Sequence, residues 1–207
     1  MNGLASLLLR AALEYVRRAA TPFLLSMLCG FAMLSVSLCG SAAARAVLLS
    51  VGLCATYAAA FLALYSEGGR AMRMKRRGEL RRADKPECAD ARDGRYHICR
   101  EYRPYKGAVI GILACLLPAA LALAAGNFTS RLVLLLAAGW AYLPALALSN
   151  GFGGTGVYSL ASASASAQYL SLVPMAAFAA VCAAAYVLGG RRARAAGAGR
   201  GKGVMEK

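Results

Sequence analysis

The sequence has few acidic residues and almost no histidine. Its 207 residues include 9 Asp or Glu and 1 His against 24 Lys or Arg, which gives a formal net charge of +15. No charged side chain lies between residues 132 and 190. Proton relays, ion-coupled transport and intramembrane hydrolysis normally depend on ionisable groups within the membrane-spanning helices. Because the apolar segments of this chain contain no Asp, Glu, Lys or His, we do not expect these activities.

Charge is missing from several apolar runs that are each long enough to cross a bilayer. A hydrocarbon core roughly 30 Å thick needs about 20 helical residues to cross it, and a backbone in lipid must satisfy its own hydrogen bonds. These runs therefore predict an all-α integral membrane protein, a small polytopic helical bundle. They are approximately Pro22–Cys39, Ala46–Ser66, Gly107–Gly126, Leu132–Ser149 and Leu172–Gly189.

The Lys and Arg residues indicate which side of the membrane each segment faces. Residues 67–106 hold 13 of them, and residues 190–207 hold six. Lys and Arg near short loops mark the cytoplasmic side. We therefore expect a basic cytoplasmic loop at 67–106, a cytoplasmic N-terminus two spans earlier, and a basic cytoplasmic tail at 190–207.

The tail conflicts with a simple count of crossings. Three apolar runs separate it from the central loop, and an odd number of crossings would place it outside. We predict four full transmembrane spans plus one partial or re-entrant apolar helix, with five full spans as the alternative. Leu172–Gly189 is mostly alanine and inserts more weakly than Leu132–Ser149, but the arginines behind it would anchor its cytoplasmic end. Which run is partial stays open at this point.

A glycine run lies between these two segments. GFGGTG at 151–156 has the G-x-G-x-x-G spacing of a dinucleotide-binding loop. Such a loop requires a preceding strand and an acidic residue about 20 positions later. Here an apolar helix precedes the glycines and the next acidic residue is Glu206. We predict a hinge within a Gly/Ser/Ala-rich linker at 150–171, and no cofactor.

The first transmembrane hairpin is predicted at 22–66. Residues 1–21 have one apolar and one charged face, which is typical of an amphipathic cytoplasmic or interfacial helix. Glu14 and Arg18 are correctly ordered for an i,i+4 ion pair within it. Thr21 and Pro22 have the residue types of an N-cap and a first helical turn, so we expect the first span to begin there. The alternative is that residues 1–21 are an ordinary cytoplasmic extension of that span.

The second transmembrane region is predicted at 107–189. It opens with Gly107 and Gly111, which form a G-x-x-x-G pair. Close helix packing is the physical use of that spacing.

The central loop begins with a dense group of basic residues. Each such charge near an anionic surface contributes up to about 1 kcal/mol of attraction, so we predict contacts with anionic lipid head groups. A role in fixing the topology would by itself also account for them. No recognisable stacking module accompanies them, and we expect no nucleic acid as a partner. The predicted head-group contacts are Arg70, Arg73, Lys75, Arg76, Arg77, Arg81 and Arg82.

Metal binding has one set of candidates, in the same loop. Cys88, His97 and Cys99 offer the ligand types of a zinc site. Their C-x8-H-x-C spacing matches no common structural zinc module, and cytoplasmic cysteines ordinarily stay reduced. We therefore predict no metal site.

No catalytic constellation is recognisable, and we assign no catalytic residue. The leading hypothesis is a small non-enzymatic membrane protein that serves in scaffolding, in assembly or as an accessory subunit, in contact with lipids and with other membrane proteins or copies of itself. One alternative is a channel or transporter component for neutral or apolar solutes, and a second is a metal-dependent membrane enzyme. The Ala-, Arg- and Gly-rich usage suggests a GC-rich coding sequence and hence a bacterial cytoplasmic membrane.

Overall fold

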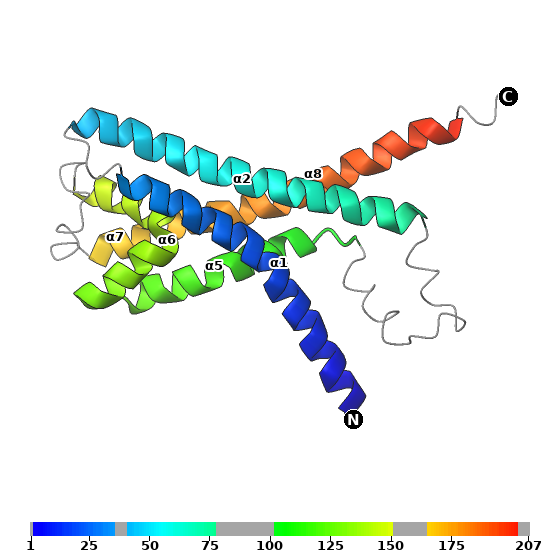
Figure 1. Ribbon diagram of the computed structural model, residues 1–207, viewed down its shortest axis with the longest axis horizontal. Helices are drawn as coiled ribbons and strands as arrows, with labels where there is room; N and C mark the ends of the chain where they lie inside the picture. Colours follow the sequence, from blue (N-terminus) through cyan, green and yellow to red (C-terminus); the bar gives the residue numbers. More distant parts are fainter. Residues whose placement is uncertain (1, 36–40, 78–101, 151–164, 203–207) are drawn as a thin grey trace.

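The computed structural model describes residues 2–35, 41–77, 102–150 and 165–202, and within these ranges the chain is helical and contains no strand. Figure 1 shows the helices packed side by side in an elongated bundle. They are α1 (Asn2–Leu34), α2 (Ala42–Arg77), α5 (Lys106–Ala124), α6 (Phe128–Ser149), α7 (Ala165–Leu170) and α8 (Leu172–Lys202).

Four helical stretches in the described part of the chain are long and apolar enough to cross a membrane. This confirms the prediction of a small all-helical membrane bundle. The stretches are Ala42–Lys75, Lys106–Ala124, Phe128–Ser149 and Ala165–Ala196, the last of which includes α7.

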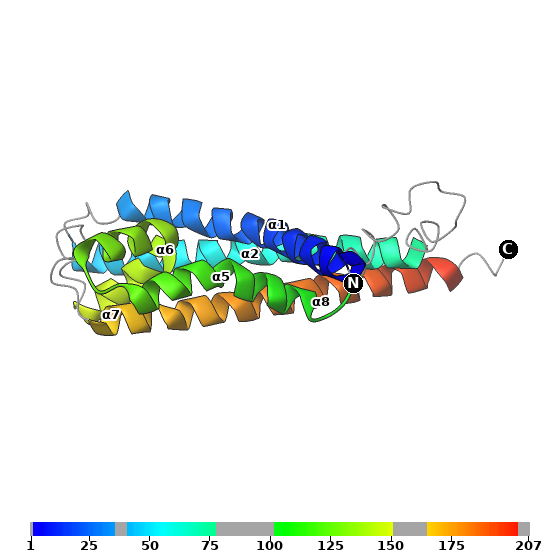
Figure 2. The same ribbon diagram turned by 90° about the horizontal axis from the view of Figure 1, so that it is seen from below.

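The helices α2, α5 and α8 follow the long axis of the molecule, and α1 crosses them at an angle (Figures 1 and 2). The start of α1, the end of α2, the start of α5 and the end of α8 all lie toward one end (Figure 1). We call this the basic end, and the opposite end the far end. The basic end is defined by Arg70, Arg73 and Lys75 of α2 and by Arg191, Arg192 and Arg194 of α8.

α6 does not run the length of the bundle. Both of its ends lie at the far end, near the end of α5 and the start of α7 (Figures 1 and 2). The helix bends at Ala138, whose φ of −140° and ψ of 33° are non-helical. Each arm has about ten residues and is about 15 Å long, which is half of a hydrocarbon core about 30 Å thick.

Protein encloses the bend, since Ala138 is fully buried and Trp140 is 1% exposed. Non-helical backbone at membrane depth is tolerated where protein surrounds it. α6 therefore turns back on itself within the bundle, and Leu172–Gly189 is part of the long helix α8.

Several boundaries differ from those predicted. α1 continues through Pro22, so the prediction that Thr21 and Pro22 open a new helix is wrong. Proline removes one backbone hydrogen bond but does not end a helix that packing supports on both sides. α2 continues to Arg77, about three turns beyond the predicted apolar run. The first part of the predicted loop at 67–106 is therefore helical.

The predicted linker at 150–171 also ends earlier than expected, because Ala165–Leu170 is helical as α7. The glycine run at 151–156 lies outside the described residues. On the other side of α6, Asn127 and Ser130 form a capping box: the Ser130 backbone N–H donates to the Asn127 side chain at 2.9 Å, and the Asn127 backbone N–H donates to the Ser130 hydroxyl at 3.1 Å. This cap starts a new helix immediately after α5.

Glycines allow α8 to approach both α2 and α5 closely. A Cβ on Gly107 would lie 2.8 Å from the Cys182 carbonyl oxygen, and one on Gly111 would lie 2.9 Å from the Ala179 Cα. The predicted use of this G-x-x-x-G pair in close packing is confirmed. Where α2 crosses α8, a Cβ on Gly68 would collide with the backbone of Tyr186.

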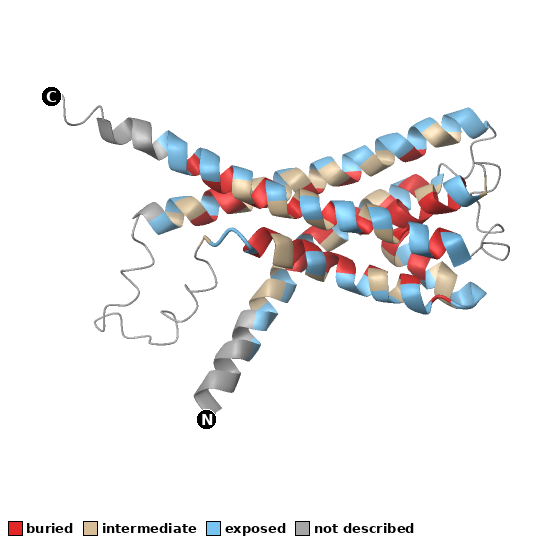
Figure 3. Ribbon diagram, turned by 180° about the vertical axis from the view of Figure 1, so that it is seen from behind, coloured by how far each residue is buried: buried red, intermediate tan, exposed pale blue. Residues whose placement is uncertain are grey.

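The outward faces of the bundle are apolar. Figure 3 shows buried residues where helices meet and exposed residues along the outer faces. Large hydrophobic side chains are more than half exposed on α1, α2, α5 and α8, and Leu28, Leu62, Leu116 and Val173 are examples. Such surfaces are not compatible with water but suit a lipid environment.

Candidate functional site

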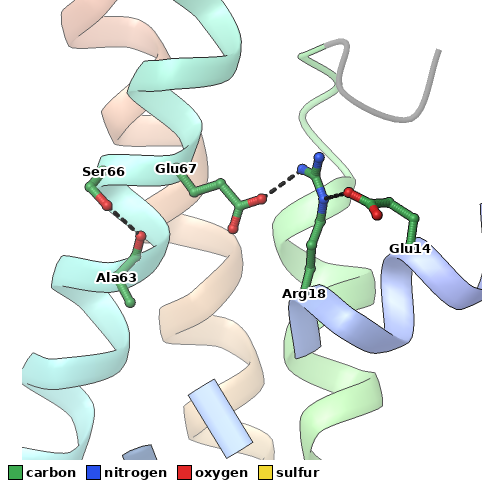
Figure 4. Close-up of polar contacts among 5 residues, drawn as sticks. All are labelled: Glu14, Arg18, Ala63, Ser66 and Glu67. Carbon is green, nitrogen blue, oxygen red and sulfur yellow. Dashed lines mark hydrogen bonds and ion pairs between the residues drawn. The ribbon is translucent and has the colours of Figure 1, made fainter. Parts of the chain in front are cut away.

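An ion-pair cluster joins α1 to α2 at the basic end. The Arg18 guanidinium donates through Nε to Glu14 at 3.1 Å and through one Nη to Glu67 at 2.6 Å. Glu14 lies one turn before Arg18 on α1, as predicted, whereas Glu67 belongs to α2 (Figure 4). The side chains are only 16% to 28% exposed. Arg18 therefore links the two helices at a site that water screens only in part.

Lys106 lies beside this cluster at the start of α5 and is 1% exposed. Its Nζ is 6.0 Å from the ring centroid of Tyr15, which follows Glu14 in α1. That distance is within the range of a cation–π interaction. The pair brings a third helix to the cluster and places a second positive charge there.

Tyr186 brings in α8, the fourth helix. Its ring stacks on that of Tyr102, with centroids 5.4 Å apart and planes 4° from parallel. The Tyr186 backbone lies against Gly68, the residue after Glu67. The Tyr186 hydroxyl is buried and has no hydrogen-bond partner among the described residues.

The cluster has the chemistry of an anchor. Glu14 and Glu67 carry two negative charges, and Arg18 and Lys106 carry two positive ones, so the charges cancel. A neutral set of paired charges can be held between helices at lower desolvation cost than an unpaired charge. These residues fix the ends of four helices relative to one another.

Sequence reasoning found only the Glu14–Arg18 half of this cluster. Glu67 and Lys106 are the first and last residues of the predicted loop, and a loop assignment gives no reason to bring them together. The position of Glu67 could have indicated a role at the end of the helix, because this residue directly follows an apolar run and is the acidic residue closest to it.

The predicted head-group contacts are solvent-accessible where the structure describes them. Arg70, Arg73 and Lys75 are exposed on the last turns of α2. Of the remaining four, Arg76 and Arg77 belong to the last turn of α2, but their side chains are outside the described part, as are Arg81 and Arg82 entirely.

α8 adds basic residues that were not among the predicted contacts. Arg191, Arg192 and Arg194 are exposed on α8, directly after the point where Gly189 crosses Tyr65 of α2. Arg192 donates to the hydroxyl of Tyr65 in α2 at 3.0 Å. This bond and the glycine contacts hold α2 and α8 together at their crossing.

Other polar atoms are buried on α6 and on the neighbouring helix α7. Trp140 Nε1, the Tyr142 hydroxyl and Gln168 Nε2 have no hydrogen-bond partner among the described residues. The indole of Trp140 packs against Phe178 and Tyr57, with ring centroids 4.9 Å and 6.3 Å away. These atoms lie on or next to the bent helix α6, where buried polar groups without partners are costly.

The three metal-ligand candidates, Cys88, His97 and Cys99, lie outside the described residues, so their role stays a prediction. Within the described ranges, no three His, Cys, Asp or Glu side chains are grouped in a way that would hold a metal ion. The cysteines in these ranges are free thiols at positions 29, 54, 115 and 182.

Comparison with known proteins identifies no relative. No family model matches the chain, and no curated protein or solved structure is similar to it at a significant level.

Proposed function

We propose that this chain is a non-enzymatic integral membrane protein that serves as a scaffold, assembly factor or accessory subunit and binds anionic lipid head groups at its basic end. The observation that carries the proposal is that exposed basic residues follow the crossing of α2 and α8 on both helices. Each exposed cation near an anionic membrane surface contributes about 1 kcal/mol of attraction. Six exposed cations on two helices, held together by the Arg192–Tyr65 hydrogen bond, offer a dense surface for head groups.

The proposed topology places the basic end in the cytoplasm of a bacterial cell. α1, α2, α5 and α8 cross the membrane, and α6 enters it from the far side and returns. The start of α1, the end of α2 and the end of α8 lie toward the same end of the bundle, which agrees with the rule that Lys and Arg mark the cytoplasmic side. α1 is included because its 33 residues extend about 50 Å and its Leu24 and Leu28 are exposed to the surroundings.

The non-enzymatic part of the proposal rests on the chemistry of the clustered charges. Arg18 is engaged by two carboxylates, and Lys106 lies against Tyr15. Groups committed to each other in this way support a structural role. Turnover of a lipid or peptide by the purified protein alone would contradict it.

The lipid contacts are tested in nanodiscs that contain equal amounts of phosphatidylglycerol and phosphatidylcholine. Lipids that remain with the purified protein after detergent extraction are counted by mass spectrometry. We expect enrichment of phosphatidylglycerol with the wild-type protein and its loss in the triple variant R70Q/R73Q/K75Q. The matched control is R70K/R73K, which keeps the charges and should keep the enrichment. The proposal is wrong if the triple variant retains as much phosphatidylglycerol as wild type.

A second candidate function is supported by the bent helix α6. Discontinuous helices and buried polar side chains form the substrate sites of many membrane transporters, and Trp140, Tyr142 and Gln168 supply three buried polar atoms without partners. This favours a channel or transporter component for neutral solutes as the alternative. Flux of neutral solutes into proteoliposomes that contain only this protein would support it, and the absence of such flux would leave the scaffold proposal as the better one.

A further inference from the structure

An apolar groove runs between α1 and α5, close to the basic end. It has a volume of about 300 Å³. Small side chains on both helices leave this space open, and larger apolar side chains form its walls. Its lining includes Val16, Ala20 and Phe23 of α1, and Leu113, Ala114 and Leu117 of α5.

The position of the groove matches the outer part of one membrane leaflet. From Val16 to Phe23, α1 rises about 10 Å, which is less than half of a hydrocarbon core about 30 Å thick. The end nearest the basic end begins at Val16, and Arg17 and Arg18 directly follow it in the sequence. The groove therefore lies where the first methylenes of an acyl chain meet the head-group region.

One exposed positive charge lies next to this end of the groove. Arg17 is exposed and directly follows Val16 in α1. Lys106 is buried and packs against Tyr15, so it is not available to a head group. The nearby carboxylate of Glu14 is already paired with Arg18, and no acidic residue lines the groove.

We infer that the α1–α5 groove binds one acyl chain of an anionic phospholipid, with the phosphate at Arg17. Apolar walls receive the chain through burial of apolar surface, and the exposed cation of Arg17 beside the mouth favours a negatively charged head group. This inference rests on the proposed lipid contacts but assigns a separate, single site away from the exposed cations of α2 and α8.

The experiment is a titration of the purified full-length protein with phosphatidylglycerol or phosphatidylcholine of identical chains, followed by native mass spectrometry. The wild-type protein should retain one phosphatidylglycerol more tightly than the rest. Ala20→Leu, which fills the groove from an exposed position, should abolish this tightest binding. Ala180→Leu places the same side chain on an exposed face of α8 outside the groove, and should leave it unchanged.

Arg17→Gln tests the head group without changing the groove. It should weaken the tightest phosphatidylglycerol about fivefold and leave phosphatidylcholine unaffected. The inference is overturned if Ala20→Leu and Arg17→Gln both retain that lipid as wild type does.

The titration also separates this inference from the proposed function. One result would contradict the groove site alone. In it, the wild-type protein prefers phosphatidylglycerol, Ala20→Leu keeps this preference, and R70Q/R73Q/K75Q loses it. A wild-type protein that shows no preference for phosphatidylglycerol contradicts both.

Discussion

Gly30 of α1 lies directly against the bend of α6 at Trp140. A Cβ at position 30 would come within 2.9 Å of the Trp140 backbone nitrogen and 3.3 Å of the Gly139 nitrogen. The absence of a side chain at position 30 thus lets α1 close over the non-helical residue Ala138. This contact covers the bend, and the Trp140 ring next to it packs against Phe178.

The first prediction concerns this contact. Gly30→Val should destabilise the protein by about 1–3 kcal/mol, because overpacking against backbone forces the helices apart. Trp140 is the only tryptophan in the chain, so its fluorescence reports on the bend during thermal unfolding in detergent. Gly126→Val is the control, since a Cβ there meets nothing within 4 Å. Equal melting temperatures for the two variants would contradict the packing described.

The crossing of α2 and α8 should be equally sensitive to added side-chain volume. Gly189→Ala places a methyl group against the backbone of Tyr65, so we expect a loss of about 1–3 kcal/mol. The hydrogen bond from Arg192 to Tyr65 should weaken as the helices separate. Gly69→Ala is a matched control in the same crossing, because its Cβ would lie at an ordinary 3.4 Å from the Gly189 oxygen. Unfolding temperatures in detergent compare the two, and a larger effect at position 69 would contradict this geometry.

Arg18 should matter more than its neighbour Arg17. Arg18→Ala leaves the partly buried carboxylates of Glu14 and Glu67 without their shared partner, and we expect a loss of about 1–3 kcal/mol after allowance for their exposure. Arg17 is exposed, so Arg17→Ala should change stability by less than about 0.5 kcal/mol. Chemical unfolding in detergent micelles measures both. If the two substitutions have the same effect, the cluster does not hold α1 to α2.

The hairpin shape of α6 predicts that its two ends face the same side of the membrane. Single cysteines at Asn127→Cys and Ser149→Cys, in a background without the seven native cysteines, should both react with an impermeant thiol reagent added outside intact cells. Arg194→Cys, at the basic end, should react only after the cells are opened. Labelling of positions 127 and 149 from opposite sides would show that α6 spans the membrane.

The cysteine and histidine of the central loop give the last prediction. The purified protein should contain no stoichiometric zinc by elemental analysis, and the variant C88S/H97A/C99S should unfold at the wild-type temperature. Bound zinc that is lost in this variant would restore the metal-dependent enzyme as a candidate.

Much of the fold follows from where charge is absent. The lengths of the apolar runs predict membrane helices because lipid leaves the backbone no other partner. The basic residues of the loop and tail predict an even number of crossings between them, and hence one partial helix. The role of Gly107 and Gly111 in close packing could also be predicted from the sequence, since that spacing places both residues on one helix face.

The sequence did not indicate which apolar run was partial. Hydropathy ranked Leu132–Ser149 as the stronger inserter, yet α6 is the helix that bends. Hydropathy measures transfer into an apolar environment, and the interior of the bundle satisfies it as well as lipid does. α6 is strongly apolar because neighbouring helices surround it, and the contact between Gly30 and Trp140 that encloses it joins residues far apart in the chain.

Glu67 and Lys106 also show which features follow from the sequence and which depend on the tertiary structure. The sequence by itself determined that this chain forms apolar helices with basic residues gathered in a few segments, because the solvation of each side chain is a local property. The tertiary structure alone decided that Arg18 meets Glu67, that Lys106 lies against Tyr15, and that α6 turns back at Ala138. Each of these depends on how helices pack at glycine contacts, and packing is set by the shapes of surfaces distant in sequence.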